Sequence, residues 1–359
     1  MMTSYDGGSI VRIGISIGYL ATVLSFMFCI LGCAMTQTEF QHKSKADALP
    51  RKVILGTVMQ RFDGTLHDRL KLAETVIAEV GTEAANKYPG RKLDLVVLPE
   101  FAIATGKGQG YELAVKLEGE VENRLGAAAR RLGAYVIVPV TLQEGKRLSN
   151  AAVLFDRTGK VFGIYRKVHT VVDDKDAIEN GVNPGADYPV FDCDFGKLGI
   201  QICWDMSYPD GWDALAAKGA ELVASPSASP ATIRIAAHAV RCGYWVITST
   251  VRDNVTLFNP LGMISRQSTS GRAMVCEIDL SYALLGWSET LDNGNAMKKK
   301  YGDRVGYLFS IREDGGVFWS NDPTKTIGSM YREMGLREVT VDISQSERVN
   351  DMARGGKAK

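Results

Sequence analysis

Residues 199–205 read Gly-Ile-Gln-Ile-Cys-Trp-Asp, and the apolar run before Cys203 predicts a short, buried β-strand. Tyr208-Pro-Asp210 and the helical pattern over Ala214–Lys218 predict that the chain turns after this cysteine and then enters a helix. Open α/β sheets place their sites at the carboxyl ends of strands, which is where Cys203 is expected to stand. A cysteine after a buried strand is more often an inert core residue, so Cys203 alone does not establish a site.

Strands and helices are predicted to alternate on both sides of this segment. Apolar residues at spacings of three and four from Leu66 to Val80 indicate one buried helix face. Further helices are predicted over Glu120–Leu132, Ala214–Lys218 and Ile233–Arg241. Strands are predicted over Val53–Val58, Leu93–Leu98, Tyr135–Val140, Ala151–Phe155, Val161–Tyr165, Leu198–Ile202, Leu222–Ser225, Trp245–Thr250 and, as the last strand, Val275–Leu280. This alternation predicts a layered α/β domain over residues 51–287.

The N-terminal segment has a different character. The run Ile13–Thr38 contains no charged residue and is long enough to cross a bilayer, which takes about 20 apolar residues. Residues 1–38 are therefore predicted to be an apolar leader, followed by a polar linker over 39–50. Two interpretations stay open: a signal sequence cleaved near Gly32–Ala34, with Cys33 as a lipoprotein-type lipid anchor, or an uncleaved anchor helix. Either one predicts a membrane-associated protein, exported or signal-anchored, and leaves the side of the membrane open.

The C-terminal segment, residues 288–359, also differs from the predicted domain. It is rich in Asn, Asp, Gly and Lys, and a helical pattern occupies Ile327–Met334. We expect a C-terminal extension that wraps the domain or a partner subunit.

Composition and charge exclude several classes of protein. The chain has 359 residues, of which 45% are hydrophobic and 23% charged, as in ordinary globular proteins. Its formal net charge of +1 provides no basic field that would attract a nucleic acid. The cysteines include no Cys-x-x-Cys pair and the histidines are isolated, so neither a metal site nor a disulfide scaffold is predicted.

Three predicted strand ends carry reactive side chains: Glu100, Lys167 and Cys203. Each one alone is more often a solvated or inert residue. Together they would provide a nucleophilic thiolate, an ammonium that lowers the thiol pKa and holds an oxyanion, and a carboxylate that carries the proton. Backbone N–H groups at the turn after Cys203 are expected to favour the thiolate as well. These are the parts that acyl transfer requires.

The segments Leu98-Pro-Glu100, Tyr165-Arg-Lys167-Val-His169 and Ile200-Gln-Ile-Cys203-Trp-Asp205 resemble, in order, the three catalytic motifs of the nitrilase, or carbon–nitrogen hydrolase, superfamily. The resemblance extends from Lys52 to Leu280 and includes Asn180-Gly-Val-Asn-Pro-Gly185. It implies a four-layer αββα sandwich of the nitrilase type, which usually forms a homodimer or higher homo-oligomer through its outer helices.

The resemblance also implies a role for each site residue. Glu100 would be the general base and acid, Lys167 the stabiliser of the tetrahedral intermediate, and Cys203 the nucleophile. Glu179 matches a second glutamate that positions the substrate and Lys167, and the backbone N–H of Trp204 would complete the oxyanion hole. The reaction requires no cofactor.

The expected substrate is a small molecule with a linear, non-peptide amide or N-carbamoyl bond, because Cys-Trp-Asp is closer to amidases and carbamoylases than to nitrilases, which usually carry Cys-Trp-Glu. Nitrile hydrolysis by the same residues is an alternative, and a non-catalytic, membrane-tethered binding protein on the same scaffold is an alternative from another class. Arg241-Cys242 and Thr248-Ser249-Thr250 replace residues that are common in the superfamily, which leaves the substrate class open.

Two other chemistries are disfavoured. A papain-like pair of Cys203 with His238 does not fit the strand that precedes the cysteine. His169 with Asp173 and Asp174 forms only a faint metal site, because a metal enzyme needs a cluster of ligands.

Overall fold

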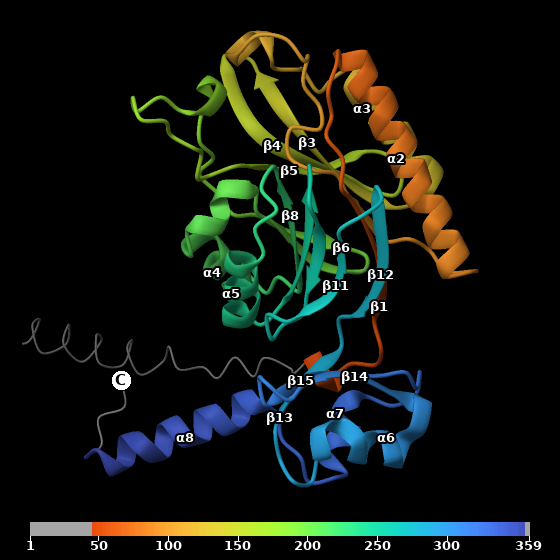
Figure 1. Cartoon of the computed structure of the whole chain (residues 1–359), viewed down its shortest axis with the longest axis vertical. Helices are drawn as coiled ribbons and strands as arrows, with labels where there is room; N and C mark the ends of the chain where they lie inside the picture. The colour runs from red at the N-terminus through yellow and green to blue at the C-terminus, as the bar shows by residue number, and fades with distance from the viewer. Residues whose placement is uncertain (1–44, 356–359) are drawn as a thin grey trace, which may run out of the picture. The chain divides into compact units, whose positions relative to one another are not determined.

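The computed structural model describes residues 45–355, and two six-stranded sheets form its framework (Figure 1). The first sheet has the strand order β12-β1-β2-β3-β4-β5 and consists of β1 (Lys52–Val58), β2 (Leu95–Val97), β3 (Tyr135–Glu144), β4 (Arg147–Phe155), β5 (Val161–Arg166) and β12 (Ala273–Asp279). The second has the order β11-β10-β9-β8-β7-β6 and consists of β6 (Val190–Cys193), β7 (Gly196–Ile200), β8 (Leu222–Ser227), β9 (Trp245–Thr250), β10 (Val255–Phe258) and β11 (Ile264–Ser268). Within these two sheets, pairing is parallel for β1-β2-β3 and for β7-β8-β9 and antiparallel elsewhere, so β2 lies between two parallel neighbours and β7 between parallel β8 and antiparallel β6.

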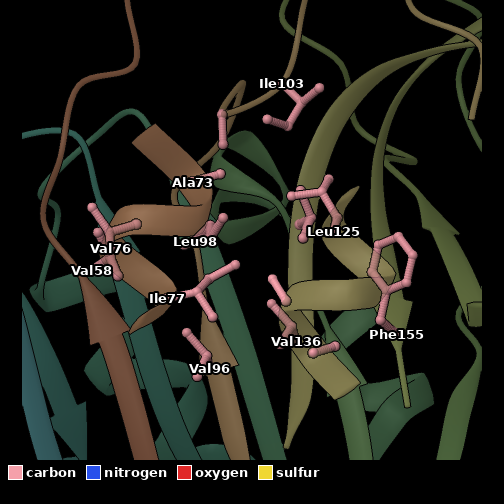
Figure 2. Close-up of a cluster of buried hydrophobic side chains, with 14 of the residues drawn as sticks. Val58, Ala73, Val76, Ile77, Val96, Leu98, Ile103, Leu125, Val136 and Phe155 are labelled. Carbon is pink, nitrogen blue, oxygen red and sulfur yellow. The ribbon is translucent and has the colours of Figure 1, made fainter. Parts of the chain in front are cut away.

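Two helices cover the outer face of the first sheet: α2 (Leu66–Lys87) and α3 (Glu120–Leu132). A capping box between Thr65 and Asp68 begins α2, and Gly133 in the left-handed conformation ends α3. The predicted bounds of α3 are confirmed at both ends. Figure 2 shows how Ile77 of α2 and Leu125 of α3 meet the sheet side chains in one buried apolar cluster. Removing this apolar surface from water stabilises the outer layer.

The second sheet carries its own helical layer, α4 (Asp210–Ala217) and α5 (Ile233–Cys242), which Figure 1 shows on the opposite side of the sheets from α2 and α3. Between the two sheets, alternate side chains such as Leu55, Val97 and Ile200 form a buried apolar core. The layer order is therefore helix, sheet, sheet, helix, which confirms the predicted αββα sandwich.

The chain does not end its strands at Val275–Leu280, so the prediction of a last strand there is wrong. A third, three-stranded sheet follows, with the order β13-β15-β14: β13 (Tyr282–Gly286), β14 (Val305–Ser310) and β15 (Gly315–Ser320). The later helices are α6 (Asn295–Tyr301), α7 (Ile327–Arg332) and α8 (Val339–Ala353), of which α7 confirms the predicted helical piece. The third sheet uses residues on both sides of the predicted boundary at 287, and that boundary stays a prediction.

Short 3-10 helices connect several elements: η1 (Lys45–Asp47), η2 (Gly110–Glu112), η3 (Glu179–Gly181), η4 (Cys203–Ser207), η5 (Asp292–Gly294) and η6 (Gly302–Arg304). Within residues 45–355, none of the helices combines the length and the apolar character that a membrane span requires. The predicted leader over residues 1–38 lies outside the described residues.

Candidate active site

Lys167 is the centre of a buried cluster of charged groups. It follows β5, and its Nζ donates hydrogen bonds to Glu100 Oε1 at 3.0 Å and to Glu179 Oε1 at 2.7 Å. Lys167 is 1% exposed and Glu100 is 2% exposed. The structure thus brings together three side chains that sequence analysis singled out from segments far apart in the chain.

Glu100 stands just after β2 and is held by two further donors. Asn150 of β4 donates from Nδ2 to Glu100 Oε1 at 2.8 Å, and the backbone N–H of Ala228 donates to Glu100 Oε2 at 2.9 Å. Asn150 Nδ2 also lies 3.5 Å from Glu179 Oε1, so this amide joins the two glutamates. Sequence analysis missed Asn150; its signal was a single amide inside the apolar run of β4.

Cys203 is the first residue of η4 and has a φ of +46°, in the left-handed region that side chains rarely adopt. Burial and the charge of Glu100 raise the pKa of its thiol to about 11, although Lys167 and a hydrogen bond with Ser227 act to lower it. The expectation of a low thiol pKa is therefore wrong, because the nearby carboxylate and the burial outweigh the ammonium. At neutral pH the thiol keeps its proton and is hydrogen bonded to a carboxylate that can accept it.

Lys167 has the opposite balance of effects. Burial by itself lowers the pKa of its ammonium, but the negative charges of Glu100 and Glu179 outweigh burial and raise the pKa above its ordinary value. The ammonium therefore stays charged at neutral pH. A fixed positive charge beside the sulfur is suited to hold an oxyanion.

Glu179 is the first residue of η3, and the segment after η3 is hydrogen bonded to the backbone of Lys167. The Gly185 N–H donates to the backbone carbonyl of Lys167 at 2.8 Å, and Asn183 exchanges hydrogen bonds with the backbone of Leu148. A Cβ at Gly185 would lie 2.1 Å from the Arg166 carbonyl oxygen, so only glycine allows this close approach.

Trp204 follows Cys203 on the first turn of η4. Its side chain is 36% exposed, and the Arg234 guanidinium lies 5.7 Å from the centre of its ring. Its backbone N–H belongs to the residue directly after Cys203. The oxyanion-hole role of that N–H stays a prediction.

The residues that depart from the superfamily pattern make structural contacts. Arg241 pairs with Asp213 of α4, and the Cys242 thiol lies 3.8 Å from the same carboxylate. The hydroxyl groups of Thr248–Thr250 donate to backbone carbonyls. These contacts join layers and strands and leave the substrate class open.

The histidines considered for a papain-like pair and for a metal site have other contacts. His238 directs Nε2 toward the backbone carbonyl of Met206 at 2.9 Å, and His169 lies beside the Asp205 carboxylate. Asp173 accepts hydrogen bonds from the backbone of its own loop. Over residues 45–355, no group of three or more His, Cys, Asp or Glu side chains is arranged to hold a metal ion.

A double-sheet αββα sandwich that holds a cysteine beside a lysine and two glutamates defines a protein of the nitrilase fold class. Residues 59–283 match the carbon–nitrogen hydrolase family, and the chain belongs to that family. The match confirms the predicted membership of the nitrilase, or carbon–nitrogen hydrolase, superfamily.

Individual relatives are more distant. The chain is 34% identical over 161 residues to a nitrilase from Pyrococcus abyssi, a match that covers 43% of this chain and 56% of the relative. It is 27% identical over 240 residues to the omega-amidase NIT2 of Danio rerio, covering 60% of this chain and 84% of the relative. The crystal structure of Saccharomyces cerevisiae Nit3, a member of the nitrilase superfamily, has a TM-score of 0.53 at 21% identity and covers 64% of this chain and 91% of its own. At that identity the likeness supports the fold alone.

Proposed function

We propose that this protein hydrolyses the carbon–nitrogen bond of a linear amide or N-carbamoyl compound through Cys203, Glu100 and Lys167. The observation that carries the proposal is the pair of hydrogen bonds from Lys167 Nζ to Glu100 and Glu179, 3.0 and 2.7 Å long, beside a thiol that is hydrogen bonded to Glu100. A buried base, a fixed cation and a thiol in contact with the base are the groups that thiol-dependent acyl transfer needs.

The first half of the reaction begins with a neutral thiol. Glu100 takes the Cys203 proton as the sulfur attacks the substrate carbon, so a thiolate need not accumulate in the resting enzyme. The S–C bond forms, and the substrate oxygen becomes an oxyanion that the Lys167 ammonium and the Trp204 N–H hold. Glu100 then returns the proton to the leaving nitrogen, the C–N bond breaks, and ammonia or an amine departs from a thioester.

The second half of the reaction removes the acyl group. Glu100 takes a proton from a water molecule, whose oxygen attacks the thioester carbon. The C–S bond breaks, the acid is released, and the proton returns to the Cys203 sulfur. Each proton moves through one carboxylate, and no cofactor takes part in this sequence of steps.

Glu179 has a different role in this proposal. Its carboxylate accepts a hydrogen bond from Lys167 at 2.7 Å, and it is the second carboxylate, beside Glu100, that this lysine contacts. It holds the ammonium in place and keeps it protonated, so that Lys167 does not depend on Glu100 alone for a counter-charge. Glu100 is thereby left free to exchange protons with the substrate.

Nitrile hydrolysis is a second candidate, since the same thiol can attack a nitrile carbon and a nitrilase is among the relatives. The Cys203-Trp-Asp205 segment favours the amide or carbamoyl substrate. Release of ammonia from a panel of amides, carbamoyl amines and nitriles tests the choice. Turnover of amides or carbamoyl amines, abolished in Cys203→Ala, supports the proposal, whereas turnover of nitriles alone would reverse it.

A non-catalytic binding protein predicts a different result in the same panel. Wild-type protein would release no ammonia or amine from any compound, and iodoacetamide would not label Cys203 faster than the other cysteines. We expect one fast, Cys203-specific adduct, because Glu100 can take the proton as the sulfur attacks the reagent, so that the raised pKa of this thiol does not prevent alkylation.

We also propose that the leader over residues 1–38 attaches the protein to a membrane and that the described domain forms a homodimer. The uncharged run Ile13–Thr38 supports attachment. Ile233 and Val240 on the outer face of α5 are 84% and 52% exposed, which supports an apolar contact through an outer helix. Membrane fractionation with protease protection tests attachment and side, and light scattering of the purified protein tests the dimer; a strictly monomeric species would contradict it.

A further inference from the structure

The carboxylate of Asp205 is completely buried and uses both of its oxygens. Oδ2 accepts from the Ile202 N–H and from the Tyr165 hydroxyl, each at 2.8 Å. Oδ1 accepts from the His169 N–H at 2.9 Å, and Nδ1 of the same histidine lies 3.3 Å away. A buried carboxylate with four nitrogen or oxygen partners has one orientation, and it fixes those partners in turn.

These partners belong to the two segments that carry the reactive groups. Ile202 is the residue directly before Cys203, whereas Tyr165 and His169 stand two residues before and two residues after Lys167. One segment follows β7 of the second sheet, and the other leaves β5 of the first sheet. The carboxylate therefore joins the two sheets at the place where the sulfur and the ammonium meet.

The turn that holds Cys203 depends on the same residue. The backbone N–H of Asp205 donates to the Ile202 carbonyl at 3.0 Å while its side chain accepts from the Ile202 N–H, so the turn is closed in both directions. The Asp205 carbonyl accepts from Trp212 Nε1 at 3.0 Å, which fastens the turn to α4. A left-handed non-glycine residue persists only where its surroundings hold it, and these bonds surround Cys203.

We propose that Asp205 is a positioning residue that sets the sulfur of Cys203 against the ammonium of Lys167. The inference rests on the proposed function, in which these two groups act on one carbonyl carbon. His169 belongs to the same device, because it offers both a backbone and a ring nitrogen to Asp205. Its other ring nitrogen lies 3.4 Å from Asp210 Oδ1, so the ring is held between two carboxylates.

Asp205→Asn is the sharpest perturbation. An amide has one acceptor oxygen, so its NH2 group must face either the Ile202 N–H or the His169 N–H, and neither backbone donor can reverse its role. Misplacement of reacting groups by about 1 Å costs about 100-fold in rate. We expect kcat to fall about 100-fold while KM changes less than about threefold, since the groups that would bind substrate in the ground state are unchanged.

The test must separate positioning from folding. Active sites are first counted by stoichiometric iodoacetamide labelling of Cys203, and kcat is expressed per labelled site. A merely structural role would lower the number of sites and leave kcat per site unchanged, which would overturn the proposal. Asp213→Asn is the matched control: it makes the same substitution at an exposed ion pair with Arg241 on α4, outside the hydrogen bonds of Asp205 and His169, and kcat should stay within about twofold.

A second variant covers the case in which Asp205→Asn does not fold. Tyr165→Phe removes one of the hydrogen-bond donors to the Asp205 carboxylate and keeps the ring, and we expect about tenfold lower kcat per site, which is the lower end of the range for a hydrogen bond to a charged group. Wild-type kcat in Tyr165→Phe, or in a folded Asp205→Asn, would overturn the positioning role. Neither result affects the proposed function, which Cys203→Ala tests separately by complete loss of turnover.

Discussion

Replacing Glu179 by glutamine removes one negative charge from the buried cluster and preserves the shape of the side chain. Glu179 Oε1 accepts from Lys167 Nζ at 2.7 Å, and the Glu179 side chain is only 16% exposed, so water screens the contact little. The glutamine oxygen can still accept from the Lys167 ammonium, so the substitution removes the charge of the acceptor only, and charged and neutral hydrogen bonds differ by about 1.5 kcal/mol. The substitution should therefore cost about 1.5 kcal/mol of transition-state stabilisation, or about tenfold in kcat/KM.

Glu179→Gln should also shift the pH profile of kcat/KM in a defined direction. Glu179 is one of the groups that raise the pKa of Lys167, so its loss lowers that pKa and the ammonium loses its proton at a lower pH. The alkaline limb of the kcat/KM profile should move to lower pH in Glu179→Gln. Glu144→Gln is the matched control, because Glu144 pairs with Arg166, the neighbour of Lys167, on an exposed surface. An unshifted limb, or kcat/KM within threefold of wild type, would refute the reasoning.

Three further substitutions have expected outcomes. Asn150→Leu removes a donor 2.8 Å from Glu100 Oε1 and should lower kcat about tenfold in steady-state assays, so an unchanged kcat would deny Asn150 any part in the site. Gly185→Ala places a methyl group 2.1 Å from the Arg166 carbonyl oxygen; both kcat/KM and the midpoint of thermal unfolding should fall, and a wild-type melting curve would contradict the clash. Arg157→Met removes hydrogen bonds to the backbone carbonyls of Leu93 and Gly133 and to the carboxylates of Asp94 and Asp194, and urea titration should show an unfolding free energy lower by about 3 kcal/mol. A loss of less than about 1 kcal/mol would contradict a stabilising role of these four bonds.

Helices and strands whose signals lie within a few consecutive residues could be predicted from the sequence. The helix Glu120–Leu132 was predicted with its observed ends because its apolar spacing and the glycine after it are local signals. The strand Trp245–Thr250 was likewise predicted with its observed bounds. The third sheet escaped because β13 pairs with β15, across an intervening helix and strand, and its glycine-containing segments do not resemble strands when taken alone.

In the site, too, residues in local sequence motifs could be predicted and residues defined by long-range contacts could not. Glu100, Lys167 and Cys203 could be singled out because each ends a strand in a recognisable motif. The roles of Asn150 and Asp205 could not, since Glu100, Tyr165 and His169, to which they are hydrogen bonded, are distant in the sequence and only the folded chain brings them together. The thiol pKa was predicted in the wrong direction because it depends on the balance between burial, Glu100 and Lys167, which is a property of distances rather than of sequence.

The most direct test concerns the acyl-enzyme. Enzyme mixed with an amide or N-carbamoyl substrate from the active panel is quenched in acid within one turnover, and its intact mass and peptide map are measured. We expect a transient adduct with the mass of the acyl group, located on Cys203 and absent from Cys203→Ala. Turnover without any adduct, or with the acyl group on another residue, would contradict the assignment of Cys203 as the nucleophile.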